Sequence, residues 1–136
     1  PLLWVVGATS LASSATILFF TPDSESANNR QLLLSYAIAL GITLALRECL
    51  PFITEHSVLL QHTHPFTITM VMIFIAMFIT LYLFSLLHIT HPPATGIALA
   101  MALHDSSYLI FGLLLCLALS LAVIKTTLSR CLENIL

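Results

Sequence analysis

The sequence has 136 residues, of which 59% are hydrophobic and only 7% are charged, with a formal net charge of −2. Soluble domains carry about 25% charged residues, so this composition excludes an ordinary water-soluble protein. It predicts an integral, multi-pass membrane protein of the plasma, inner or an organellar membrane. The expected fold class is all-α, a polytopic helix bundle in contact with the lipid bilayer. The four Lys and Arg residues are few, and we expect no nucleic-acid partner.

The first apolar stretch, residues 2–20, is uncharged but contains many small and weakly polar residues. Such residues allow helices to approach closely, so we expect this segment to pack inside protein rather than to face lipid. Residues 21–30 are rich in turn and cap residues and are typical of an aqueous loop. Because the chain is apolar from Leu2 onwards, we expect that a leading helix before residue 1 is missing.

Three further apolar stretches are long enough to cross a bilayer, which takes about 20 helical residues. They are residues 31–50, 65–88 and 107–125. Arg47 lies near the far edge of the first, and Pro51 is expected to end it because proline disrupts a helix interior. The whole chain, residues 1–136, is therefore predicted to be a single transmembrane domain.

The joint between the last two long stretches concentrates helix-starting signals at membrane depth. Pro92 and Pro93 lack a backbone N–H and have a fixed φ, which suits the first turn of a helix but not its middle. We predict a short helix over residues 92–103, beginning at one of the two prolines. Thr90 or His91 is expected to cap it.

The start of this short helix has the properties of an anion site. The N–H groups of Ala94, Thr95 and Gly96 would lack intrahelical partners, and the positive end of the helix dipole would lie beside them. Hydroxyl groups from the first apolar stretch could line a path opposite. The residues expected to bind the substrate are His91, Pro92, Pro93, Ala94, Thr95, Gly96, Ser10, Ser13 and Ser14.

The segment 92–103 is too short to cross a bilayer alone. It either extends a neighbouring span as a buried kink or forms a re-entrant half-helix that enters and leaves on one face. A re-entrant segment would place Arg47, Lys125 and Arg130 on one side of the membrane and Arg30 on the other. With a spanning segment we expect a split of two and two. The positive-inside rule favours the three-to-one distribution and would put the C-terminus in the cytoplasm or its equivalent. We therefore expect the re-entrant arrangement.

A weak internal repeat is also visible. Ala8-Thr9, then Asp23-Ser24 and a span, is echoed by Ala94-Thr95, then Asp105-Ser106 and the last span. Composition bias alone could explain so few identities. Repeats that contain interrupted helices are a recurrent arrangement in transporters.

The segment His91-Pro92-Pro93 and the small residues after it resemble the HPP family of small integral membrane proteins. A second family block, Ser-Phe-Gly-Ala-Ser-Ala and then Pro-x-Ser-x-x-Ala-x-x-Arg, is similar to residues 10–15 and 22–30. The Gly-His pair often found after that arginine is replaced by Ser35-Tyr36. The resemblance covers most of the chain. It implies a transport role, with nitrite or another small anion as the leading substrate, because plant and cyanobacterial relatives have been linked to nitrite transport.

Several individual residues leave alternatives open. His91 could carry a proton, or it could be a neutral cap whose ring bonds a backbone carbonyl. Arg30 could attract an anion at the mouth of the pathway, or it could be a solvated or structural contact. His62 and His64 are zinc-ligand types, but their spacing is a weak signal, and we expect no metal and no cofactor. No GxSxG, HExxH or Gly-rich phosphate motif is present, so no enzymatic activity is predicted.

These features together predict a membrane transporter or channel for a small monovalent anion, with nitrite as the leading candidate and proton coupling as an option. Four spans are few for an enclosed path, so we expect a homo-oligomer. Two alternatives remain open. One is a non-transporting structural or assembly subunit in which the HPP motif serves packing, and the other is a channel for a neutral small solute.

Overall fold

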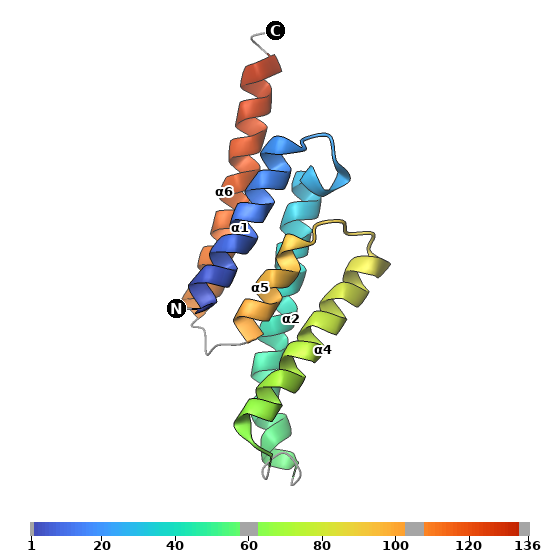
Figure 1. Cartoon of the computed structure of the whole chain (residues 1–136), viewed down its shortest axis with the longest axis vertical. Helices are drawn as coiled ribbons and strands as arrows, with labels where there is room; N and C mark the ends of the chain where they lie inside the picture. Colours follow the sequence, from blue (N-terminus) through green and yellow to red (C-terminus); the bar gives the residue numbers. More distant parts are fainter. Residues whose placement is uncertain (1, 58–62, 103–107, 134–136) are drawn as a thin grey trace.

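The computed structural model describes residues 2–57, 63–102 and 108–133. Within these ranges the chain forms five α-helices and one short 3-10 helix (Figure 1). The elements are α1 (Leu2–Phe20), η1 (Glu25–Ala27), α2 (Asn29–His56), α4 (Pro65–Leu86), α5 (Pro93–Ala102) and α6 (Tyr108–Glu133). The all-helical prediction is confirmed.

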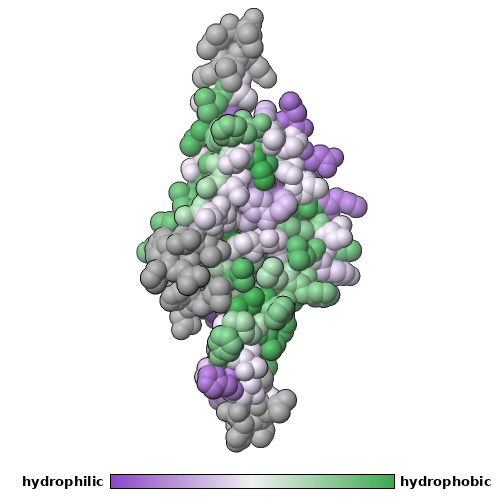
Figure 2. All heavy atoms as spheres, viewed as in Figure 1, coloured by the Kyte–Doolittle hydropathy of each residue, from purple (hydrophilic) through white to green (hydrophobic). Residues whose placement is uncertain are grey.

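Three of these helices, α2, α4 and α6, are long and apolar enough to cross a membrane. Many of their large apolar side chains face outward; Phe74 on α4 and Leu109 on α6 are each 73% exposed. Figure 2 shows such side chains over the flanks and lower half of the molecule, whereas hydrophilic residues gather at the upper right and near the bottom. Exposed apolar surface on this scale is stable in contact with lipid and not in water.

The short helix α5 occupies the centre of the bundle, where it packs against α1, α2 and α4 (Figure 1). Its residues Ala94, Ile97 and Ala98 are each 0% exposed. Small residues permit this close approach: a Cβ atom added at Gly96 would lie 3.6 Å from the Ser10 side chain, an ordinary contact distance. The expected packing of α1 inside protein holds for one face only. The small residues Gly7, Ser10 and Ser14 are buried, whereas the other face is exposed at Ala8, Thr9, Ala12, Ser13 and Thr16.

Two contacts fix the direction of α6. At one end of the bundle, the Lys125 ammonium donates a hydrogen bond to the carbonyl of Ala27, just before α2. At the other end, the Arg47 guanidinium of α2 lies 5.1 Å from the centre of the Tyr108 ring, the first residue of α6. Helix α6 thus runs antiparallel to α2 and in the same direction as α4 (Figure 1).

The described residues do not show the re-entrant path that we expected for residues 92–103. Helix α5 carries the chain away from the end where α4 finishes, and α6 begins at the Arg47 end (Figure 1). Arg30, Lys125 and Arg130 share the opposite end, which we call the basic end. The distribution of basic residues is still three to one. However, Arg30 now lies on the side with Lys125 and Arg130, and Arg47 is the one that lies on the other side. The C-terminus remains on the side with three.

Two smaller expectations also differ from the structure. Pro51 does not end α2, which continues to His56. Proline removes one backbone N–H from a helix interior, a loss that membrane helices can accommodate.

The part of the chain that the structure describes shows no internal repeat. Ala8-Thr9 lies in the middle of α1, whereas Ala94-Thr95 lies in the first turn of α5. The two pairs therefore occupy different positions in their helices. Asp105-Ser106, the other half of the comparison, lies outside the described residues.

Candidate functional site

The turn between α4 and α5 begins with a Schellman motif. The N–H of Ile89 donates to the carbonyl of Phe84 at 2.8 Å, and the N–H of His88 donates to that of Ser85 at 3.4 Å. His88 has a φ of 51°, the left-handed conformation that glycine usually supplies at this position. The buried side chains of Phe84 and Ile89 belong to the hydrophobic core and hold the motif in place.

Gln31, at the start of α2, fixes the next part of the turn. Its Nε2 atom donates to the carbonyl of His88 at 3.1 Å, and its Oε1 atom accepts from the N–H of Thr90 at 3.4 Å. The backbone polar groups of the turn thus find partners on a neighbouring helix.

Helix α5 begins at Pro93, one of the two predicted starting points. The N–H of Ala94 donates to the carbonyl of His91 at 3.4 Å, and the N–H of Thr95 donates to that of Pro92 at 3.0 Å. Two of the three N–H groups expected to be without partners are therefore bonded within the turn. The reason is that the two prolines close a tight turn whose carbonyl groups reach these donors.

The His91 ring is fully buried, with an exposed fraction of 0%. Its Nδ1 atom lies 2.8 Å from the carbonyl oxygen of Ser26, the middle residue of η1. A carbonyl can only accept, so Nδ1 carries the hydrogen, and in the neutral ring Nε2 is an acceptor. Nε2 lies 2.9 Å from the Ser14 hydroxyl. The ring therefore connects the turn to both η1 and α1.

The Ser14 hydroxyl is the centre of a buried chain of hydrogen bonds. It lies 2.8 Å from the Tyr36 hydroxyl and 3.1 Å from the Ser10 carbonyl. Ser14 and Tyr36 are both 0% exposed. With neutral His91, the Tyr36 hydroxyl donates to Ser14, and Ser14 donates to the ring.

Tyr36 was not expected to belong to the site. The one signal for it in the sequence was the pair Ser35-Tyr36, which stands where the resemblance places Gly-His. The structure shows that this position faces the His91 ring, with ring centres 6.1 Å apart. The departure of Ser35-Tyr36 from the Gly-His pair of the family was therefore the one feature of the sequence that could have pointed to Tyr36.

An open groove of about 400 Å³ lies between α1 and the start of α5. Of the expected binding residues, Ser10, Ser13, Pro92, Pro93, Thr95 and Gly96 line it, together with Thr9 and Ile17. The other three expected residues, Ser14, His91 and Ala94, are fully buried and are not among the lining residues. In addition, Ser10 donates a hydrogen bond to the carbonyl of Pro93 and so joins the two walls.

The remaining candidate residues lie elsewhere. Arg30 is exposed at the start of α2 and does not line the groove. His64 is the N-cap of α4, where its Nδ1 atom accepts from the N–H of Phe66 at 3.3 Å. His62 lies outside the described residues. Within the described ranges no group of three or more His, Cys, Asp or Glu side chains is arranged to hold a metal ion.

Comparison with known families gives a match that covers nearly the whole chain. The family model described as "HPP, transmembrane region" matches residues 2–136. The chain belongs to the HPP transmembrane family. With three helices long enough to span, this HPP protein is an integral, multi-pass membrane protein. Searches of curated proteins and of solved structures each gave no significant match.

Proposed function

We propose that this HPP protein is a transporter or channel for a small monovalent anion, with nitrite as the first candidate, and has no enzymatic role. The observation that carries the proposal is the groove between α1 and the start of α5. Hydroxyl-bearing residues from both helices meet there, Thr9 and Ser13 on one wall and Thr95 on the other. The start of α5 adds the positive end of a helix dipole. Such groups can replace part of an anion's hydration shell, whose loss is otherwise prohibitive.

The groove is open on the outer surface of a single chain, which bears on the oligomeric state. A path for an ion has to be shielded from lipid along its length. We propose that a second copy of the chain covers the groove in a homo-oligomer. Ser13, which is exposed on α1, would then lie close to the partner subunit.

Proton coupling is a further part of the proposal, and the hydrogen bonds of His91 support it. If the ring takes up a proton, Nε2 becomes a donor to Ser14. Ser14 can then turn its own hydrogen to the Ser10 carbonyl, 3.1 Å away. The cluster can thus accept a proton without leaving a buried polar atom unpaired, which would cost about 1–3 kcal/mol.

Two alternatives have specific observations behind them. The bonds from His91 to Ser26 and Ser14 join separate segments, as they would in a purely structural subunit whose HPP turn serves packing. The residues that line the groove carry no charged side chain, which would also suit a channel for a neutral solute. Both alternatives predict that nitrite flux is absent.

The test is solute uptake by proteoliposomes that contain the full-length protein. Nitrite would be compared with nitrate, chloride, formate and neutral urea, at pH about 5.5 and about 7.5, on either side of the ordinary pKa of histidine. Because burial lowers the pKa of His91, any effect of its protonation should appear toward the lower pH. The Thr95 hydroxyl donates to the Pro92 carbonyl at 2.7 Å, and in the proposed path it would turn its hydrogen to the ion. We therefore expect saturable nitrite uptake that falls at least about fivefold in Thr95→Val, since the substitution removes this donor. Thr16→Val is the matched control, because Thr16 is an exposed threonine of α1 outside the groove.

Two results would contradict the proposal. If urea moved and anions did not, the neutral-solute channel would replace it. If nothing moved in protein that is folded and oligomeric, the structural alternative would hold. Cross-linking through Ser13→Cys in a background without other cysteines tests the covered groove, with Phe74→Cys on the lipid-facing side of α4 as the control. Equal cross-linking at both positions would contradict an interface at the groove.

A further inference from the structure

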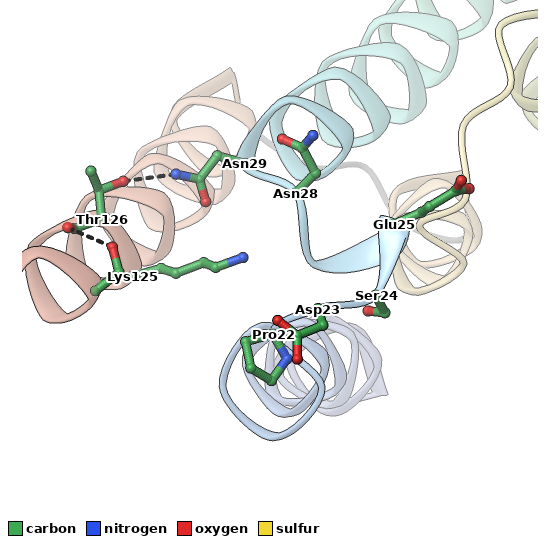
Figure 3. Close-up of a pocket in the computed structure, with 9 residues that line it drawn as sticks. Pro22, Asp23, Ser24, Glu25, Asn28, Asn29, Lys125 and Thr126 are labelled. Carbon is green, nitrogen blue, oxygen red and sulfur yellow. Dashed lines mark hydrogen bonds between the residues drawn. The ribbon is translucent and has the colours of Figure 1, made fainter. Parts of the chain in front are cut away.

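A second polar pocket, separate from the groove, lies at the basic end of the bundle (Figure 3). Its volume is about 510 Å³, and it opens between the segment that follows α1 and the last turns of α6. The lining residues include Asp23, Ser24, Lys125, Thr126 and Ser129. None of them belongs to the groove near α5, so the pocket is independent of the proposed anion path.

The two walls of this pocket carry opposite charges. The Lys125 side chain extends from α6 into the pocket, and the Asp23 carboxylate lies on the facing wall (Figure 3). One N–H of the Lys125 ammonium is bonded to the carbonyl of Ala27. An ammonium has three donors, so two remain for an anionic oxygen in the pocket. Asp23 is exposed and offers an acceptor for a cation.

The wall that presents Lys125 is held in place by side-chain bonds. The Asn29 amide at the start of α2 donates to the Thr126 hydroxyl at 2.7 Å and to the Ala122 carbonyl at 3.3 Å. These bonds fix α6 against α2 beside the pocket (Figure 3). The part of α6 that carries Lys125 is therefore held beside the pocket by the fold.

The position of the pocket along α6 places it at the edge of the bilayer. The apolar span of α6 runs from Tyr108 to Ser129, and Ser129 lines the pocket. Large apolar side chains of the same region face outward: Val123 is 63% exposed, Leu128 47%, and Phe20 at the end of α1 82%. A molecule with a polar head in the pocket would have its apolar part beside these side chains.

We propose that this pocket binds the headgroup of a zwitterionic phospholipid that carries a primary ammonium, as a phosphoethanolamine headgroup does. Its phosphate interacts with Lys125, and its ammonium donates to Asp23. Two carboxylates, Asp23 and Glu25, line the pocket against one ammonium, which disfavours a purely anionic headgroup. A choline headgroup has no N–H to donate, so the pocket discriminates against it.

The test uses the full chain in detergent and counts bound lipids by native mass spectrometry. Phosphatidylethanolamine, phosphatidylcholine and phosphatidylglycerol with identical acyl chains compete at equal concentration. We expect the ethanolamine lipid to be favoured over the choline lipid by about tenfold, the effect of one charge-assisted hydrogen bond. Asp23→Asn should abolish the preference, because Asp23 is the partner of the ammonium. Lys125→Gln should instead weaken the binding of all three lipids, because each of them carries a phosphate. Arg30→Gln should keep the preference, because Arg30 is a neighbouring basic residue that does not line the pocket.

Asp23→Asn keeps the test decisive if Lys125→Gln fails to fold, since Asp23 is exposed. Soluble phosphoethanolamine forms a further arm; it should compete weakly because it lacks acyl chains. Equal binding of the ethanolamine and choline lipids would overturn the proposal. So would preferential binding of phosphatidylglycerol, or a preference that survives Asp23→Asn. Competition by soluble phosphoethanolamine as strong as by the lipid would show a site for a free phosphate ester instead.

Discussion

The Nε2 atom of His91 lies 2.9 Å from the Oγ atom of Ser14, a residue 77 positions earlier in the chain. This contact joins the turn before α5 to α1, and the Nδ1 bond of the same ring joins the turn to Ser26. The HPP histidine therefore has a defined structural role. Its two nitrogen atoms can be tested separately.

Replacement of His91 tests each of its two bonds. His91→Ala removes both and leaves a cavity, so the free energy of unfolding should fall by about 3 kcal/mol. An asparagine amide occupies a place similar to Nδ1 and a glutamine amide a place similar to Nε2. His91→Asn should therefore keep the bond to Ser26, and His91→Gln should keep the bond to Ser14. Each should lower the free energy of unfolding by about half as much as His91→Ala does. Unfolding in detergent with rising denaturant measures all three.

A result in which His91→Ala is as stable as the native protein would contradict this account of the ring. The double variant with Ser14→Ala gives a second check. If the two residues act through their mutual bond, their effects should be less than additive. Fully additive effects would show that the bond contributes nothing.

Tyr36→Phe removes the hydroxyl that donates to Ser14 but keeps the buried ring. We expect the free energy of unfolding to fall by about 1 kcal/mol. The effect is small because Ser14 retains its bond to His91 and no buried charged group is left unpaired. Tyr82→Phe on α4 is the matched control, since the Tyr82 side chain is 57% exposed and should give less than about 0.5 kcal/mol. Thermal unfolding of the two variants side by side decides the point; equal effects would argue against the buried chain.

His88 is strained by its φ of 51°, and glycine should relieve that strain. We expect His88→Gly to raise the free energy of unfolding by about 0.5–1 kcal/mol, because glycine adopts a positive φ without strain. Removal of the exposed imidazole should cost few contacts. His88→Ala keeps a Cβ in the left-handed conformation and should show no such gain. A destabilised His88→Gly would mean that the imidazole makes a contribution outside the turn.

The basic end, with Arg30, Lys125 and Arg130, should face the cytoplasm or its equivalent. Cys49 is exposed near the opposite end of α2, and Ser24→Cys places a thiol at the basic end. In a background without the other cysteines, a membrane-impermeant thiol reagent should reach these two positions from opposite sides. Labelling of both from one side would contradict the direction of α2.

The start of α5 could be predicted from the sequence because proline acts locally. Pro92 and Pro93 restrict their own φ, and the helix begins at the second of them. The membrane-spanning helices were likewise predictable from the length of uninterrupted apolar residues. The groove was anticipated in part, since Ser10, Ser13, Thr95 and Gly96 do line one surface.

The direction of α6 and the partners of His91 could not be predicted in the same way. The re-entrant path was predicted from the distribution of four basic residues between the two sides of the membrane. A three-to-one distribution also results when α6 runs in the opposite direction. The partners of His91 are a carbonyl at Ser26 and a hydroxyl at Ser14. A backbone carbonyl has no sequence signature, and one serine among several small residues of α1 gives no signal for its position in the bundle. These contacts are set by tertiary packing.

The length of α5 has a consequence for how the protein is made. Long apolar helices such as α4 can enter a bilayer one by one and associate afterwards. The ten residues of α5 are too few to cross a bilayer by themselves, and the polar turn before them finds its partners on α1, η1 and α2. Helix α5 therefore reaches its place only after those segments have gathered, so the HPP turn closes at a late step of biogenesis. A chain that stalls earlier leaves this turn without partners and open to quality-control proteases.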